Sequence, residues 1–123
     1  MNQIKFTIPS IPKSINSMYQ INYGQRHIYL SNDARIWKSQ SKIYVPKFEI
    51  EDGSHIGISA VYHMNCFFKN GKVRKVDGPN LDKLLLDTIS EKIGLDDSLV
   101  FFWCGKKVHS DEDKVVVKMW EIR

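Results

Sequence analysis

The sequence predicts a small α+β domain in which a mixed β-sheet carries two main helices packed on it. Three observations predict this class. Residues 56–68 place apolar side chains at every second position, as a strand with one buried face does. The stretches 31–44 and 79–94 repeat apolar residues at helical spacing. The 123 residues, 42% of them apolar, contain no repeat or linker, so residues 1–123 are expected to form one domain.

The first element expected is a half-buried strand near the N-terminus. Ile4, Phe6 and Ile8 alternate with polar residues, and Pro9 and Pro12 end the pattern. The strand is therefore expected to bury one face.

Residues 10–25 are interpreted as a long loop because they are rich in Ser, Asn, Pro and Gly. Loops of this length in a small domain are often functional. Asn16, Tyr19 and Arg26 combine hydrogen bonding, stacking and positive charge, which suits contacts with phosphates and bases. The alternative is a solvated loop that Tyr19 and Tyr23 hold against the core.

A first helix is expected to begin at Ser31, a favourable N-cap residue, and to end near Tyr44, before Pro46. Ala34 and Trp37 lie on its apolar face and are expected in the core. The basic residues nearer the other side, available either to phosphates or to solvent, are Arg35, Lys38 and Lys42.

A long strand and a tight turn follow. The residues predicted to share the buried face are Ile56, Ile58, Ala60, Tyr62, Met64, Cys66 and Phe68. The Asn70-Gly71 pair is a strong reversal signal, so residues 69–72 are expected to form a turn. Cys66 and Cys104, the only cysteines, lack metal-site spacing, and Cys66 is expected to be a buried free thiol.

The second helix is expected to start with Pro79 at its first position, after Gly78 as N-cap, and to end at Gly94. The residues that share its apolar face are Leu81, Leu85 and Ile89, with Leu84, Leu86 and Thr88 beside them. The residues that line its polar face are Asn80, Lys83, Asp87 and Glu91. Lys83 and Asp87 are four apart, so they are expected either to form a surface salt bridge or to share a functional role.

Carboxylates flank this helix, and cations precede it. Lys72, Arg74 and Lys75 come directly before Asp77, and Asp96 and Asp97 follow Gly94. After Asp97, an apolar run at 99–103 is expected to be a buried strand. A polar turn at 105–113 and a strand at 115–122 are expected to complete a hairpin with it. Cations that hold a DNA backbone beside carboxylates that hold a metal ion are typical of phosphodiesterases. The alternative is an ordinary charged turn.

A helix of this length keeps its two ends about 20 Å apart. Asp77 and Asp97 can therefore meet only if the Gly94 turn folds back, or across a subunit interface.

The polar residues in and around this helix follow the order Asp77, Asn80, Lys83, Asp87 and then the Asp96–Asp97 pair. This order, at nearly the same spacing, resembles the motif of the RusA family of Holliday-junction resolvases. The N-terminal features of the family are matched by Pro9, Pro12, Asn16, Tyr19, Arg26, Tyr29 and Ser31, and the resemblance covers essentially the whole chain. One position departs from the pattern, because Pro79 stands where the family usually has a second acid.

The resemblance implies a RusA-like fold and a homodimer that resolves four-way DNA junctions in recombination and repair, in a phage or prophage context. It implies catalytic roles for Asp77, Lys83 and Asp97, and Mg²⁺ or Mn²⁺ held by Asp77 and Asp97, with Asp96 a further candidate ligand. DNA contacts are expected from Asn16, Arg26, Lys72, Arg74, Lys75 and Asn80. Apolar surface for a dimer interface is offered by Phe67, Phe101, Phe102 and Trp103.

Two alternatives stand beside a resolvase. The chain is either a relative that binds branched DNA without cutting it, because Pro79 replaces an acid, or a protein-interaction module with incidental charge. The net charge of +4 favours a polyanionic partner. No stretch approaches the roughly 20 apolar residues of a membrane-spanning helix. We therefore expect no membrane partner, and we expect a cytoplasmic location.

Overall fold

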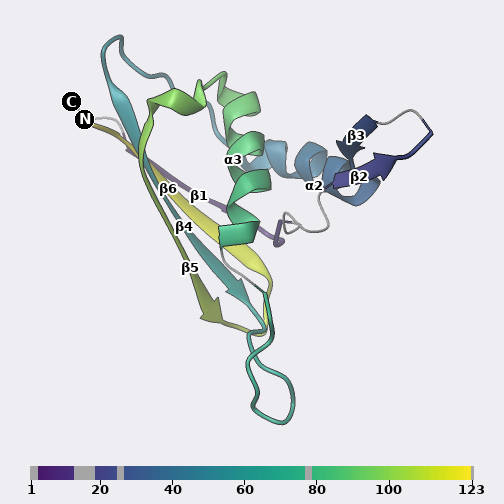
Figure 1. The fold of residues 1–123 in the computed structure, drawn as a ribbon. Coiled ribbons are helices and arrows are strands. Elements are labelled where there is room, and N and C mark those ends of the chain that lie inside the picture. The colour runs from purple at the N-terminus through teal and green to yellow at the C-terminus, as the bar shows by residue number, and fades with distance from the viewer. Residues whose placement is uncertain (1–2, 13–18, 25–26, 77–78, 123) are drawn as a thin grey trace.

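A computed structural model describes residues 3–12, 19–24, 27–76 and 79–122 of the chain. They form an α+β fold around a four-stranded sheet (Figure 1). In spatial order its strands are β1 (Gln3–Ile8), β6 (Lys114–Ile122), β4 (His55–Met64) and β5 (Val100–His109). β6 is antiparallel to both neighbours, whereas β4 and β5 are parallel. The predicted mixed sheet is therefore confirmed.

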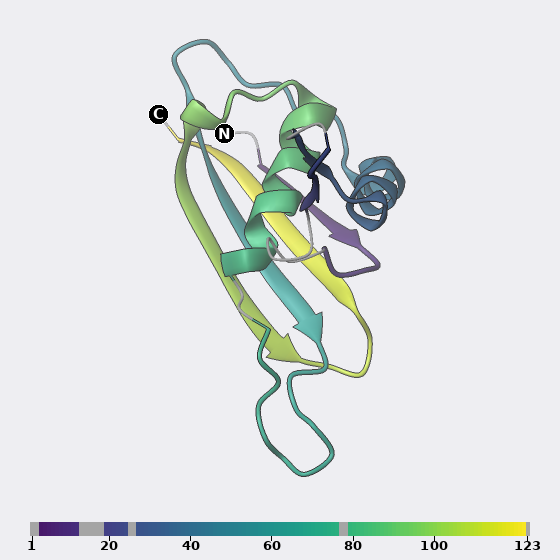
Figure 2. The same cartoon turned by 45° about the vertical axis from the view of Figure 1, so that its right-hand side comes forward.

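Both helices lie on the same face of this sheet. Figure 2 shows α3 (Pro79–Ile93) lying along the sheet, with α2 (Asn32–Ser41) at its side. The short 3₁₀ turn η1 (Lys42–Tyr44) extends α2. Ser31 caps α2 as predicted, since its Oγ accepts a hydrogen bond from the Ala34 N–H at 3.2 Å. Gly94 ends α3 with a φ of 70°, in the left-handed region that glycine adopts at little cost.

The core lies between the sheet and α3. The buried side chains that fill it come from β1 (Phe6, Ile8), β4 (Ile56, Ile58, Ala60, Tyr62, Met64), β6 (Val115, Val117, Met119) and α3 (Leu81, Leu84, Leu85, Ile89). Burying each large apolar side chain contributes roughly 1.5–3 kcal/mol. The period-two and helical patterns therefore predicted the core-facing residues of β1, β4 and α3 correctly.

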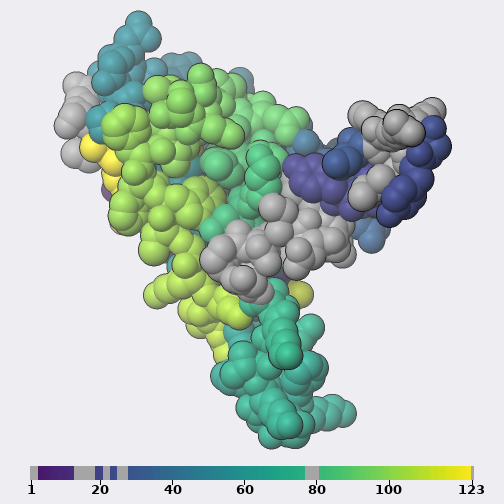
Figure 3. Space-filling model, in the orientation of Figure 1, coloured from purple at the N-terminus to yellow at the C-terminus, as the bar shows by residue number. Residues whose placement is uncertain are grey.

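The end of the long strand differs from the prediction. β4 stops at Met64, and the chain then projects beyond the sheet as a loop of residues 65–75 (Figures 1 and 3). Cys66 is half-buried and Phe68 is exposed, so neither continues the buried face. The predicted reversal is present, because Gly71 has a φ of 85° and Phe67 bridges to Val73 across the turn. Both cysteines are free.

The prediction for the C-terminal strands is wrong in three respects. β5 continues to His109, so only residues 110–113 remain for the predicted turn. It is an edge strand, with Phe101 69% and Phe102 49% exposed, rather than a buried one. β6 does not form a hairpin with β5, because it pairs between β1 and β4. Apolar content favours a strand without fixing its neighbours, and Lys106 and Lys107 suit a sheet edge.

The segment expected to be a long loop, residues 10–25, contains one strand of a second, two-stranded sheet. β2 (Tyr19–Asn22) pairs antiparallel with β3 (His27–Leu30), and this hairpin projects from the body of the molecule (Figures 1 and 3). Four-residue strands are too short to produce a recognisable alternation. The composition of the segment was therefore mistaken for a loop.

Candidate functional site on helix α3

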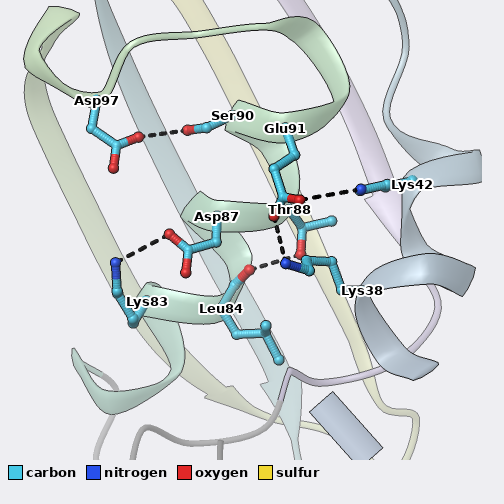
Figure 4. A network of polar contacts seen from close by, with 9 residues as sticks. All are labelled: Lys38, Lys42, Lys83, Leu84, Asp87, Thr88, Ser90, Glu91 and Asp97. Carbon is cyan, nitrogen blue, oxygen red and sulfur yellow. Dashed lines mark hydrogen bonds and ion pairs between the residues drawn. The ribbon is translucent and has the colours of Figure 1, made fainter. Parts of the chain in front are cut away.

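The outer surface of α3 carries the predicted lysine and aspartate as a direct pair (Figure 4). Lys83 Nζ lies 3.1 Å from Asp87 Oδ1, and the two side chains are 44% and 22% exposed. The hydrogen bond and charge of Asp87 raise the pKa of Lys83, and weaker contributions come from Tyr19 and Asp97. The ammonium group is therefore protonated at neutral pH and lies in a field set mainly by carboxylates.

Asp97 lies on the same side of α3 as this pair. Its Oδ1 accepts a hydrogen bond from Ser90 Oγ at 2.7 Å, and its charge contributes to the raised pKa of Lys83. The left-handed Gly94 makes this possible, because the chain turns back there and Leu95 N–H bonds to the Ser90 carbonyl at 2.9 Å. The chain after α3 therefore folds back at Gly94, as we expected to be necessary for Asp97 to approach the helix.

Asp96 has a local structural task. It is the N-cap of the short 3₁₀ turn η2 (Asp97–Leu99), and its Oδ1 accepts a hydrogen bond from the Ser98 N–H at 3.0 Å. That bond lowers the pKa of the Asp96 carboxyl group. Asp96 therefore offers an ionised carboxylate, one oxygen of which caps the turn that carries Asp97.

A second polar network joins α3 to α2 (Figure 4). Glu91 accepts from Lys38 Nζ at 2.5 Å and lies 3.5 Å from Lys42 Nζ. The hydrogen bond from Lys38 is the main cause that lowers the pKa of Glu91. Lys38 and Lys42, expected to face phosphates or solvent, instead pair with a carboxylate of the neighbouring helix. This network holds the two helices together and leaves the Lys83 side of α3 open.

Asp82, in the first turn of α3, points toward the sheet. It accepts a hydrogen bond from the Tyr62 hydroxyl, and a Cβ placed at Gly105 would lie 2.9 Å from its Oδ1. Burial raises the pKa of Tyr62, and the adjacent Asp82 raises it further. The Tyr62 partner on β4 and the glycine that makes room on β5 depend on the tertiary structure.

The basic segment before α3 is exposed. Lys72 and Lys75 lie at the surface of the projecting loop, and Arg74 Nη1 donates to the Asn65 carbonyl at 3.0 Å across it. At the base of the loop, Lys107 on β5 donates to the carbonyl of Val76. Sequence reasoning missed Lys107, because it assigned residues 105–113 to a turn. Lys107 would have been placed on the sheet if the strand had been predicted to continue to His109.

Several predicted site residues lie outside the part of the chain that the structure describes. They are Asp77, Gly78, Asn16, Arg26 and the side chain of Asn80. Among the residues that are described, no three His, Cys, Asp or Glu side chains gather as a metal-binding group. Lys83, Asp87 and Asp97 are brought to one side of α3, whereas the loop carrying Lys72 lies toward its N-terminal end (Figure 1).

The arrangement suits the handling of a phosphate. A protonated lysine that is paired with one carboxylate and lies on the same side of the helix as a second, with exposed cations at the nearer end of the helix, can neutralise a polyanionic backbone and place it beside oxygen ligands. Among the described helices, none has both the length and the apolar character needed to cross a membrane.

Comparison with known proteins agrees with the resemblance noted from the motif. A family model described as endodeoxyribonuclease RusA matches residues 9–120 of the 123-residue chain. The match includes the whole of α3, the acids that flank it and the projecting loop. No curated protein matches the chain significantly.

Proposed function

The chain belongs to the endodeoxyribonuclease RusA family, and from this membership we propose that it resolves four-way DNA junctions by metal-dependent phosphodiester hydrolysis. The observation that carries the proposal is that Lys83, paired with Asp87, lies on the same side of α3 as Asp97. These residues stand at the motif positions on which the resemblance rests, and their chemistry fits a phosphodiester.

The proposed metal ligands are Asp77 and Asp97, with Asp96 as a weaker third. Carboxylate oxygens are the ligands that Mg²⁺ and Mn²⁺ prefer. Ser90 orients Asp97 through Oδ1, as an outer-shell partner does for a metal ligand. A bound ion would supply charge neutralisation at the phosphate and lower the pKa of a coordinated water.

Lys83 is proposed to hold the scissile phosphate. Its ammonium group is charged at neutral pH because the Asp87 carboxylate raises its pKa, and Asp87 fixes its direction along the helix. An ammonium group at this position stabilises negative charge on a non-bridging or leaving oxygen. Asp87 is then a positioning residue, acting through Lys83.

Two projections from the body of the molecule are proposed to hold the arms of the junction. Figure 3 shows the loop of residues 65–75 extending at the bottom of the molecule and the β2–β3 hairpin extending at its right side. The loop supplies Lys72, Arg74 and Lys75, while Tyr19 at the start of β2 lies near enough to Lys83 to influence its pKa. Asn16, Arg26 and Asn80 are the remaining proposed DNA contacts.

A homodimer is part of the proposal, because a four-way junction has two equivalent strands to cut and a two-fold dimer supplies two sites. Of the predicted interface residues, Phe67, Phe101 and Phe102 are exposed. Phe102 lies against Trp120, with 5.7 Å between the ring centroids, so Phe67 and Phe101 are the ones that we propose for the interface. Trp103 is half-buried against the core, so it has less surface to offer a partner.

A second candidate function is binding of branched DNA without cleavage. It is favoured by the state of Asp82, the first acid after the position where Pro79 replaces the family's second carboxylate. Asp82 is engaged by Tyr62 and faces the sheet, so it is poorly placed to substitute for the missing acid.

Cleavage of a synthetic four-way junction in Mg²⁺ and then Mn²⁺, with linear duplex as control, tests the proposal. Paired nicks across the junction that disappear with EDTA are expected. Tight junction binding without nicks at saturating Mn²⁺ would identify the non-cleaving alternative. Equal affinity for junction and duplex at moderate salt would contradict both.

A further inference from the structure

The sheet face opposite the helices is open. Figures 1 and 2 show α2 and α3 on one face only, and none of the other described elements covers the opposite one. The strand register fixes which side chains share this open face. Successive rows across β1, β6, β4 and β5 are Gln3–Trp120–Gly57–Phe102, Lys5–Lys118–Ser59–Cys104 and Thr7–Val116–Val61–Lys106. A further partial row is Lys114–His63–Val108.

The charge on this face has one sign. Its charged residues are Lys5, Lys106, Lys114 and Lys118, and the rows contain no Asp or Glu. Lys5 and Lys118 are direct cross-strand partners, an arrangement that destabilises a sheet unless an anion offsets it. Within the described residues, none of the four lysines forms an ion pair.

An aromatic surface lies at one end of the lysine rows. A Cβ at Gly57 would lie 2.3 Å from Cε2 of Trp120 and 2.7 Å from its Nε1, so the indole occupies the space above this glycine. The ring therefore leans across the neighbouring strand, and its centroid lies 5.7 Å from that of Phe102. Only glycine at position 57 permits this placement.

A hollow adjoins the indole. Its lining residues are Gln3, Ser59, Lys118 and Trp120, and its volume is about 330 Å³. It thus offers an aromatic ring, an ammonium group and two neutral hydrogen-bonding side chains at one place. A nucleotide presents the matching groups, which are a base with a flat face, polar base edges and a phosphate.

We propose that the open sheet face, with Trp120, Lys118 and Lys5 at its centre, binds single-stranded DNA. One base stacks on Trp120 in the hollow, and the following phosphates lie along the lysine rows. Exposed aromatic side chains on a sheet flanked by cations are a recurring solution for single strands, whose unpaired bases can reach a flat surface. This binding is separate from the cleavage proposed on the α3 side and does not depend on it.

The charge pattern favours DNA over a second copy of the chain as the occupant. A two-fold interface would use the same patch on both subunits. It would bring eight lysines together with no carboxylate from either face, and unpaired charges in an interface are costly. A polyanion neutralises the same groups and releases its counterions.

The test is a fluorescence anisotropy titration of a labelled oligothymidylate of about 12 nucleotides, within the range of single-strand binding sites. EDTA is present throughout, so the metal site contributes neither binding nor cleavage. Trp120→Leu is expected to weaken binding by roughly fivefold or more, since stacking of one base is removed. The Lys5→Gln/Lys118→Gln variant is expected to reduce the salt slope by about 1.4, or about 0.7 for each phosphate that is no longer neutralised.

Lys92→Gln is the matched control, because Lys92 is exposed on α3, the helix that covers the other face. It removes one positive charge and is expected to leave affinity and salt slope unchanged. Lys118→Gln is also expected to cut junctions as the parent does. Lys118 is exposed, so this variant tests the proposal even if Trp120→Leu folds poorly.

Equal affinity of parent and the double lysine variant would overturn the proposal. So would a loss in Lys92→Gln as large as that in Lys118→Gln, because binding would then follow net charge alone. A dimer that dissociates in Trp120→Leu while oligonucleotide binding persists would assign the face to a second copy. Stronger binding of duplex DNA than of the oligothymidylate would also contradict the proposal that this face binds single-stranded DNA.

Discussion

The two faces of the sheet differ although the same four strands form both. On the covered face, rows such as Ile58–Met119 are fully buried beneath α3. On the open face, the neighbouring row pairs Lys118 with Ser59. The difference shows that one alternating pattern can place core residues and exposed charged residues back to back. It also separates the two proposed activities, because the proposed cleavage site lies on the outer side of α3 and the proposed single-strand site lies on the opposite face of the sheet.

The largest effect is expected from Asp97→Asn, which removes a proposed metal ligand. Junction cleavage should fall by roughly 100-fold or more, since a metal ion supplies several kcal/mol of transition-state stabilisation. Junction binding should be unchanged or tighter, because the variant has one negative charge fewer near the phosphate. Cleavage kinetics and binding on the same junction measure both.

Asp111→Asn is the control for this change, since Asp111 is an exposed carboxylate in the turn between β5 and β6. It should cut like the parent. Parental cleavage by Asp97→Asn would remove Asp97 from the metal site. Loss of oligothymidylate binding in Asp97→Asn would break the separation between the two faces.

Truncating a buried side chain on the covered side should cost more folding stability than truncating one on the open sheet face. Leu85→Ala, at a fully buried position on α3, is expected to lower the free energy of unfolding by about 2–5 kcal/mol. Val116→Ala, on the half-buried open face, should lower it by about 1 kcal/mol or less. Urea denaturation measures both. Equal losses would mean that the open face is covered in solution.

Lys83→Ala tests the proposed phosphate contact. Cleavage should fall by roughly 10- to 100-fold, as expected when a hydrogen bond from a charged group is removed. Metal binding, followed by Mn²⁺ titration, should persist. Lys92→Ala, an exposed lysine on the same helix, should cut normally. If Lys83→Ala cuts as fast as the parent, the Lys83–Asp87 pair is only a surface salt bridge.

The smallest effect is expected at Glu91, which joins α3 to α2. Because its folded-state pKa lies below its ordinary value of 4.5, its contribution to stability is present above about that pH and lost as the pH falls through the lowered value. Glu91 is partly exposed, so Glu91→Gln should cost no more than about 1 kcal/mol at pH 7. Thermal melts of parent and variant should converge in acid. A difference that persists there would assign the loss to packing rather than charge.

Much of the molecule follows from patterns within a few residues. The alternation in β4 and β6, the Ser31 cap, the Gly94 end of α3 and the Lys83–Asp87 pair depend on spacings of two to four positions. Such spacings fix local geometry whatever the rest of the chain does. The motif that connects the chain to its family is equally local, since it lies on one helix and the turns beside it.

The order of the strands depended on contacts between distant segments. β6 took an interior position and β5 an edge, because the alternating buried face of β6 can pack under α3 while the lysines of β5 tolerate solvent. The same placement brought Gly105 and Tyr62 to Asp82 and Lys107 to Val76. It also laid Trp120 over Gly57. No pattern along the chain encodes these pairings, because strand partners are selected by the burial of the whole sheet against its helices.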